Sequence, residues 1–81
     1  MSRPRAVLAY VEWKITPDRR EGTEPVTHAF QCTLPECLEK SDDSGDWEAP
    51  QSWALAHSGR HPSHTSYREI ITRPYRTEML T

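Results

Sequence analysis

The sequence predicts a single small α+β domain spanning residues 1–81, with the element order β-β-α-β. Two observations predict this class: apolar residues alternate with period two in three short segments, and a fourth segment carries helix-terminus signals. The predicted strands cover 6–16, 25–32 and 65–73, the predicted helix covers 47–61, and 74–81 is expected to form a loose tail. We expect the first two strands to form an antiparallel hairpin that packs on the helix.

The predicted strands are rich in β-branched and aromatic residues. Residues 6–16 read AVLAYVEWKIT, in which Val7, Trp13 and Ile15 fall on one side of the alternation. Residues 25–32 read PVTHAFQC, which places Phe30 and Cys32 on a shared face. A polar turn with Gly and Pro separates the two segments, which favours an antiparallel return.

Helix-terminus signals bound the segment 47–61. Asp46 can cap the amino end, and Pro50 is tolerated only if it lies in the first turn. Pro62 ends the helix at about His61. The acidic segment before the helix, 38–46, is predicted to be a flexible loop.

Size and composition indicate that this chain needs an additional stabilising element. The chain has 81 residues, of which 35% are hydrophobic, and a domain this short buries only about 60% of its unfolded surface. A disulfide, a metal ion or a partner usually stabilises such a chain. No apolar run approaches the roughly 20 residues that cross a membrane, so no membrane association is expected. We expect a cytoplasmic location, where two cysteines favour metal binding over a permanent disulfide.

Four potential zinc ligands follow the spacing Cys-x4-Cys-x19-His-x3-His: Cys32, Cys37, His57 and His61. Two cysteines around a tight turn can direct two thiolates at one point, and histidines at i and i+4 project from one face of a helix. Zinc prefers such ligands in a tetrahedron. His64 is a substitute ligand if the end of the helix frays. A buried pair of cysteines or a disulfide remains the alternative.

The ligand-bearing segments carry a family resemblance. FQCTLPEC at 30–37 resembles the opening of a Cys2His2 zinc finger, and HSGRH at 57–61 resembles its close. The resemblance implies a ββα-type site closed by four protein ligands. The chain departs from the family in having 19 residues between its second cysteine and first histidine, where the finger has about 12.

Two core positions of the finger family are also altered. Ser41 stands in the place of the aromatic residue, and Ala54 stands in the place of the leucine before the first histidine. Trp53, Leu55 or Trp47 can supply the missing bulk. The whole chain, from RAVLAYVEW to YREIITRPYR, further resembles short uncharacterised bacterial proteins known only as a domain of unknown function. That resemblance implies a bacterial source and no activity.

A structural zinc protein that acts as a protein-interaction or regulatory module is the favoured function. Its protein partner and oligomeric state are left open. The acidic loop with Asp42, Asp43 and Asp46 and the exposed face of the predicted helix are candidate contact regions. Four protein ligands would close the site to substrate, and no general base accompanies them, so the sequence favours a protein that is not an enzyme.

Nucleic-acid binding by a single zinc finger is the alternative. The basic residues that could contact phosphates are Arg60, Arg68, Arg73 and Arg76. Against it, the net charge is −2, and the start of the predicted helix is acidic and contains a proline. Phosphate repulsion would oppose entry of that helix into a groove, so nucleic acid is possible but not favoured.

Overall fold

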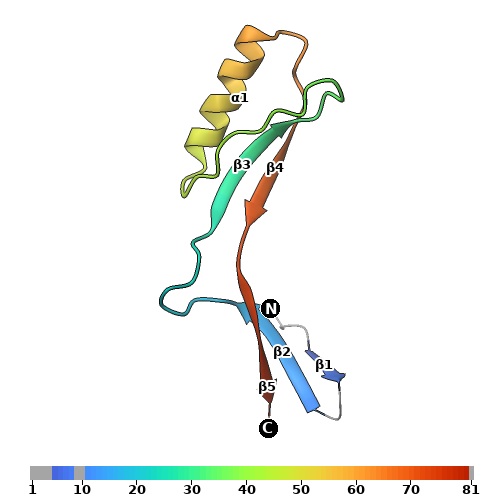
Figure 1. Cartoon of the computed structure of the whole chain (residues 1–81), viewed down its shortest axis with the longest axis vertical. Helices are drawn as coiled ribbons and strands as arrows, with labels where there is room; N and C mark the ends of the chain where they lie inside the picture. Colours follow the sequence, from blue (N-terminus) through green and yellow to red (C-terminus); the bar gives the residue numbers. More distant parts are fainter. Residues whose placement is uncertain (1–4, 9–10, 81) are drawn as a thin grey trace. The chain divides into compact units, whose positions relative to one another are not determined.

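The computed structural model describes residues 5–8 and 11–80 (Figure 1). It confirms the α+β class, with one helix and five strands that pair antiparallel in two sheets. The elements are β1 (Arg5–Leu8), β2 (Val11–Pro17), β3 (Thr27–Cys32), α1 (Glu48–Arg60), β4 (Tyr67–Thr72) and β5 (Tyr75–Leu80). The chain divides into two compact units: unit 1 comprises Met1–Pro25 and Arg73–Thr81, and unit 2 comprises Val26–Thr72.

Unit 1 contains a three-stranded sheet in the order β1-β2-β5. Two expectations are corrected here. The predicted strand 6–16 is two strands, because Leu8 pairs with Val11 and the segment folds back on itself. The predicted loose tail 74–81 contains β5, which pairs with β2 in a register that sets Trp13 opposite Met79. The sequence between Leu8 and Val11 has no Gly, Pro, Asn or Asp to indicate a reversal.

The two faces of the unit 1 sheet differ in character. One face carries Trp13, Ile15 and Met79, of which Ile15 is 38% and Met79 is 54% exposed. The opposite face carries Val7 and Leu80 together with ion pairs: Glu78 accepts from Lys14 at 3.1 Å and from Arg76 at 3.0 Å. These ion pairs lower the pKa of Glu78, with the hydrogen bond from Lys14 as the largest cause.

The turn after β2 is organised by the Asp18 carboxylate. The Arg20 side chain donates to it from Nη2 at 2.7 Å and from Nε at 3.0 Å, the Arg20 backbone N–H donates at 3.1 Å, and the Thr23 hydroxyl donates at 3.0 Å. The side-chain hydrogen bonds from Arg20 hold the pKa of Asp18 well below its usual range. Gly22 completes the turn with φ +85°, a conformation that favours glycine.

Unit 2 is built on the antiparallel pair β3–β4, whose register runs from Thr27↔Thr72 to Cys32↔Tyr67. The predicted pairing of 25–32 with the first strand is therefore wrong. Local alternation shows that a segment is a strand but does not identify its partner. The other edge of β3 is covered by the segment predicted as a flexible loop, through bridges at Gln31↔Lys40 and His28↔Ser44.

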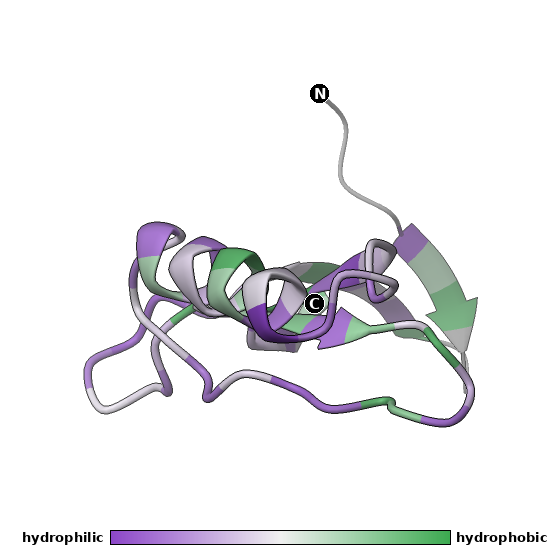
Figure 2. Ribbon diagram, turned by 90° about the horizontal axis from the view of Figure 1, so that it is seen from above, coloured by the Kyte–Doolittle hydropathy of each residue, from purple (hydrophilic) through white to green (hydrophobic). Residues whose placement is uncertain are grey.

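Helix α1 lies over β3 and confirms the predicted helix to within one residue at each end (Figure 1). The Asp46 carboxylate accepts from the Ala49 N–H at 2.8 Å, which is the expected cap. The buried residues of α1 are Pro50, Ala54 and His57. Figure 2 shows only short hydrophobic stretches along α1, so apolar burial alone holds it weakly. Among the described residues, no helix has the length and apolar character needed to cross a membrane.

Candidate metal centre

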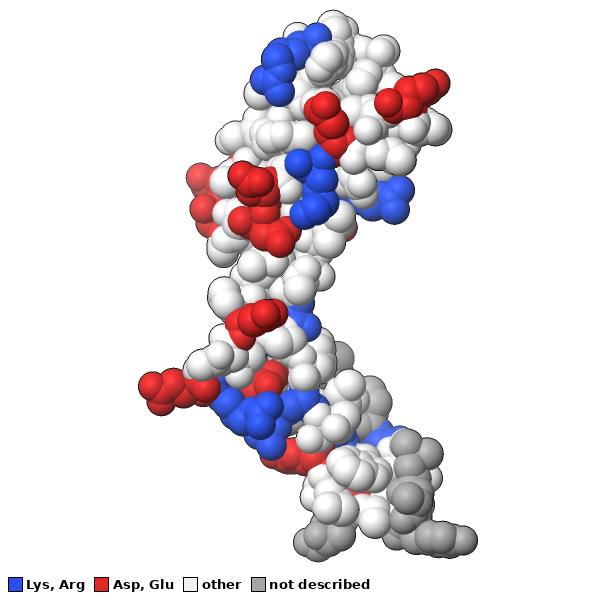
Figure 3. Space-filling model, viewed as in Figure 1, with Lys and Arg blue, Asp and Glu red and all other residues white. Residues whose placement is uncertain are grey.

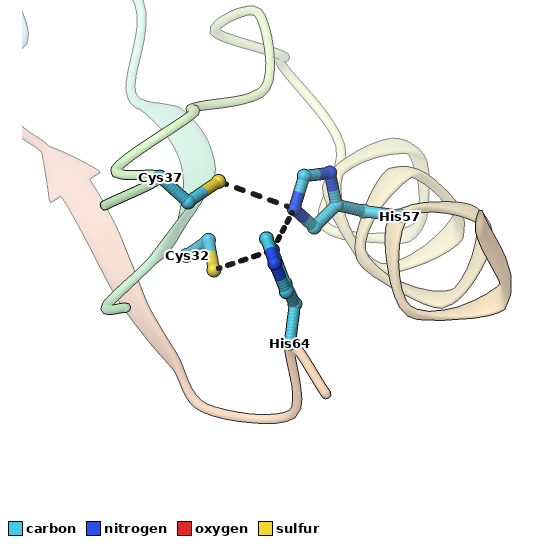
Figure 4. Close-up of side chains that lie close together, drawn as sticks. All are labelled: Cys32, Cys37, His57 and His64. Carbon is cyan, nitrogen blue, oxygen red and sulfur yellow. Dashed lines mark hydrogen bonds between the residues drawn. The ribbon is translucent and has the colours of Figure 1, made fainter. Parts of the chain in front are cut away.

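Four ligand atoms converge in unit 2, one from each of Cys32, Cys37, His57 and His64 (Figure 4). All four lie within 4.8 Å of one another. Cys37 Sγ is 3.4 Å from His57 Nε2, Cys32 Sγ is 3.7 Å from His64 Nδ1, and the two imidazole nitrogens are 3.1 Å apart. Cys32 and His57 are fully buried, whereas Cys37 and His64 are half-buried.

These separations fit a tetrahedral metal ion. Zinc–sulfur bonds of about 2.3 Å and zinc–nitrogen bonds of about 2.0 Å predict edges of about 3.5 Å between S and N and about 3.3 Å between N and N. Three of the six edges, the sulfur–nitrogen distances of 3.4 and 3.7 Å and the nitrogen–nitrogen distance of 3.1 Å, lie within about 0.2 Å of those values. The group is therefore positioned to bind one metal ion.

The two cysteines are delivered by a tight turn. Cys32 is the last residue of β3, and the N–H groups of Cys37 and Leu38 both donate to the Leu34 carbonyl, at 2.8 and 3.1 Å. Leu38 adopts φ +56°, which is unusual for a residue with a branched side chain. This conformation allows the Glu39 N–H to donate to Cys37 Sγ at 3.5 Å. Leu38 therefore helps to shape the turn that carries Cys37, and nothing in the sequence pattern indicated this role.

The second imidazole comes from His64, the substitute ligand, and not from His61. An i, i+4 pair requires the helix to run through His61, but α1 ends at Arg60 and His61 has the non-helical angles φ −134° and ψ 79°. In the turn that follows α1, the His64 N–H donates to the His61 carbonyl at 2.8 Å. This turn directs the His64 ring toward the cysteines. His61 is exposed, with its ring stacked at 4.8 Å on that of His64.

The His57 ring is fixed on both sides. Trp53, one of the three residues expected to supply the missing bulk, stacks on it at a centroid distance of 4.9 Å and an interplanar angle of 18°. His57 Nδ1 faces Glu39 Oε2 at 3.4 Å, although the contact lacks hydrogen-bond geometry. A proton on Nδ1 would face this carboxylate without a formed hydrogen bond and would leave the Nε2 lone pair for a metal.

The protonation equilibria of the site depend on burial. Burial lowers the pKa of His57, partly opposed by the Glu39 carboxylate, so its neutral ligand form is favoured. For Cys37, the N–H of Glu39 acts to lower the thiol pKa, but burial and the Cys32 sulfur outweigh it, and the pKa is raised. A cation would stabilise the thiolate that burial disfavours.

The remaining residues considered from the sequence are a cysteine pair that could form a disulfide, a further histidine and an acidic side chain. Cys32 and Cys37 are free thiols and form no disulfide. The ring of His28 is outside the group, and its Nδ1 is buried without a partner. Asp43 is an exposed partner of Lys40 at 2.9 Å.

The basic residues proposed for phosphate contact do not all belong to one unit. Arg60 and Arg68 are exposed in unit 2, whereas Arg73 and Arg76 belong to unit 1, where Arg76 pairs with Glu78. On the face drawn in Figure 3, acidic and basic side chains are interspersed within each unit. Nucleic-acid binding gains no support from this arrangement.

Comparison with known proteins identifies one family. The family model described as "Domain of unknown function (DUF7848)" matches residues 1–81. No curated protein and no solved structure matches the chain.

Proposed function

Because the chain belongs to the DUF7848 family, a domain of unknown function, we propose its function from the Cys/His group: it binds one structural zinc ion through Cys32, Cys37, His57 and His64. The observation that carries the proposal is the convergence of the four ligand atoms within 4.8 Å. In this proposal the ion ties the end of α1 and the turn after it to the turn at the end of β3.

The ligand chemistry favours zinc. Two thiolates and two imidazoles in a tetrahedron are typical of structural zinc sites, whereas magnesium and calcium select oxygen ligands. Four protein ligands leave no position for substrate or water, which supports a structural role and not catalysis. Two thiolate ligands suit a reducing compartment, so a cytoplasmic location is part of this proposal.

The energetic case rests on how little unit 2 buries without the ion. Its buried apolar residues are Ala29, Cys32, Pro50 and Ala54, all small or medium in size. Structural zinc contributes about 10–16 kcal/mol of apparent binding free energy in small fingers, against a typical domain stability of about 5–15 kcal/mol. Zinc is therefore expected to decide whether α1 stays on β3.

The ordered unit is proposed to act as a protein-interaction or regulatory module. Two large apolar side chains of the helix region remain exposed, Trp47 at 56% and Leu55 at 76%. Asp42 and Asp43 add acidic groups nearby in the sequence. Exposed apolar side chains favour a protein partner, and acidic groups oppose a phosphate backbone.

Native mass spectrometry of protein purified without chelator tests the zinc proposal. One zinc per chain is the expected stoichiometry. Cobalt(II) substitution should give the intense visible absorption of a tetrahedral S2N2 site, and both signals should be lost in Cys37→Ser and His64→Ala. His28→Ala is the matched control, because His28 lies outside the group. Metal-free protein under these conditions, or equal metal content in all variants, would refute the site.

A further inference from the structure

Two hydroxyl groups hold the turn that carries His64. Ser58 Oγ donates to the His64 carbonyl at 2.6 Å. Tyr67 Oη lies 3.0 Å from the same carbonyl, 2.6 Å from Ser58 Oγ and 3.1 Å from the Ala54 carbonyl. The two hydroxyls therefore connect α1, the turn at His64 and the start of β4. We call this pair the hydroxyl clamp.

The clamp is closely packed and wholly within unit 2. Both hydroxyls belong to half-buried residues, and the Tyr67 ring makes edge contacts with Trp53 and His57 at centroid distances of 6.2 and 6.1 Å. The two hydroxyl groups make four short contacts in all, with each other and with the His64 and Ala54 carbonyls. Each hydroxyl oxygen therefore has a polar partner in either orientation of its proton. Such a network fixes the position of the His64 backbone more firmly than a solvent-exposed turn would be fixed.

A competing ligand lies next to this turn. The His61 ring is 4.9 Å from that of His57 and 4.8 Å from that of His64. One further residue of helix would give His57 and His61 the i, i+4 relation that places two imidazoles on one helical face. The chain thus has two imidazoles for one coordination position, and the local backbone decides between them.

Resting on the zinc site proposed above, we propose that Ser58 and Tyr67 are positioning residues that select His64 over His61 as the fourth ligand. Neither residue is one of the four proposed ligands. Each acts through the His64 carbonyl, which holds the turn in the one conformation that points His64 Nδ1 at the cysteines. Without the clamp, the turn can relax and His61 can take the position.

A double-mutant cycle on the full chain tests the selection. Zinc affinity is measured by competition with a chromophoric chelator for the native protein, His61→Ala, the clamp variant Ser58→Ala/Tyr67→Phe, and their combination. In the native background, His61→Ala should change the dissociation constant by no more than about twofold, as for an exposed side chain. The clamp variant should weaken binding by about 10- to 100-fold, the usual effect of losing outer-shell support.

The deciding value is the effect of His61→Ala within the clamp variant. It should weaken zinc binding there by at least a further tenfold or so, because His61 has become a ligand. The cobalt(II) spectrum of the clamp variant should shift from the native one and lose intensity when His61 is also removed. Ser52→Ala and Tyr75→Phe are matched controls, since both side chains are exposed, and they should behave as native.

An equal effect of His61→Ala in both backgrounds would overturn the selection. If the clamp variant does not fold, the same cycle is run with Tyr67→Phe alone, which keeps the ring and removes one hydroxyl. His64→Ala separates the two proposals: a loss in the native background beyond the roughly 10- to 100-fold typical of outer-shell groups supports the zinc site even if the clamp proves neutral. No effect of His64→Ala would refute both.

Discussion

Unit 2 buries side chains completely, whereas every described side chain of unit 1 keeps some exposure to solvent. The buried residues are Ala29, Cys32, Ser41, Pro50, Ala54 and His57, and all belong to unit 2; Ser41 and Ala54 keep 5% and 7% exposure, and the other four are fully buried. Two of them are proposed ligands. Unit 1 instead combines sheet hydrogen bonds with ion pairs such as Lys14–Glu78. Burial in this chain is therefore concentrated around the candidate metal centre, and the two units should respond differently to metal, mutation and pH.

Metal removal is expected to have the largest effect and to act on unit 2. Loss of a contribution on the order of 10 kcal/mol exceeds what a core of this size can replace. Hydrogen exchange before and after chelation measures it by region. The amides of Cys32 and Ser41, which donate to Glu39 and Phe30 carbonyls, should lose protection, while the β2–β5 amides should keep theirs. An equal loss of amide protection in both units would show that the ion does not stabilise unit 2 selectively.

Truncation of the Trp53 side chain is expected to cause the second-largest loss of stability. Trp53→Ala removes the ring that packs on His57 and should destabilise unit 2 by about 3 kcal/mol, the lower end of the range for large-to-small changes at an aromatic site. Trp47→Ala is the matched control, because Trp47 is 56% exposed and should cost much less. Urea unfolding of the metal-loaded protein gives both values. Equal costs would show that the Trp53 stack contributes nothing specific.

The Leu38 conformation provides a smaller test within the same unit. Its φ of +56° carries a backbone cost of about 1 kcal/mol or more for a non-glycine residue. Leu38→Gly should therefore be neutral or stabilising, whereas the β-branched Leu38→Val should destabilise by about 1 kcal/mol or more. Thermal unfolding of the metal-loaded variants measures the difference. The reverse order would contradict the assigned turn geometry.

The smallest effect is expected from acid in unit 1. The pKa of Asp18 is held low by Arg20 in the folded state, whereas an unperturbed aspartate titrates near about 3.9. Because the pKa of Asp18 is lower in the folded state than in the unfolded state, the ionised carboxylate stabilises the folded protein. This stabilisation is complete above the unfolded pKa and is lost as the pH falls from about 4 through the folded pKa. Asp18→Asn should abolish this acid dependence. Chemical shifts of β2 and β5 amides during an NMR titration follow it, with Asp42→Asn as an exposed control.

The parts of the structure that follow from local sequence signals are the helix and the positions of two strands. Asp46, Pro50 and Pro62 bound α1 almost as expected, because caps and prolines act on their own neighbourhood. Strand pairing did not follow, because β3 pairs with β4 across 35 to 45 residues that local alternation does not connect.

The candidate site was only partly predictable for the same reason. The cysteines and His57 follow from spacing, because a tight turn and a helix face are local structures. The choice between His61 and His64 depends on where the helix ends and on how the next turn is held. That turn is held by Tyr67, which lies on a strand, so no ligand spacing could show it. The contacts of Glu39 with His57 and of Ser58 with the His64 carbonyl likewise depend on the tertiary structure and leave no pattern in the sequence.

The unequal exposure of the four ligands gives the site an open side and a closed side. Cys37 and His64 are half-buried residues, whereas Cys32 and His57 are fully buried. An exchanging ion or a chelator would meet the outer sulfur and the outer imidazole first, and the inner pair would release last. Exchange is accordingly expected to be faster with small chelators than with bulky ones of equal strength, because two of the four ligand residues are fully buried.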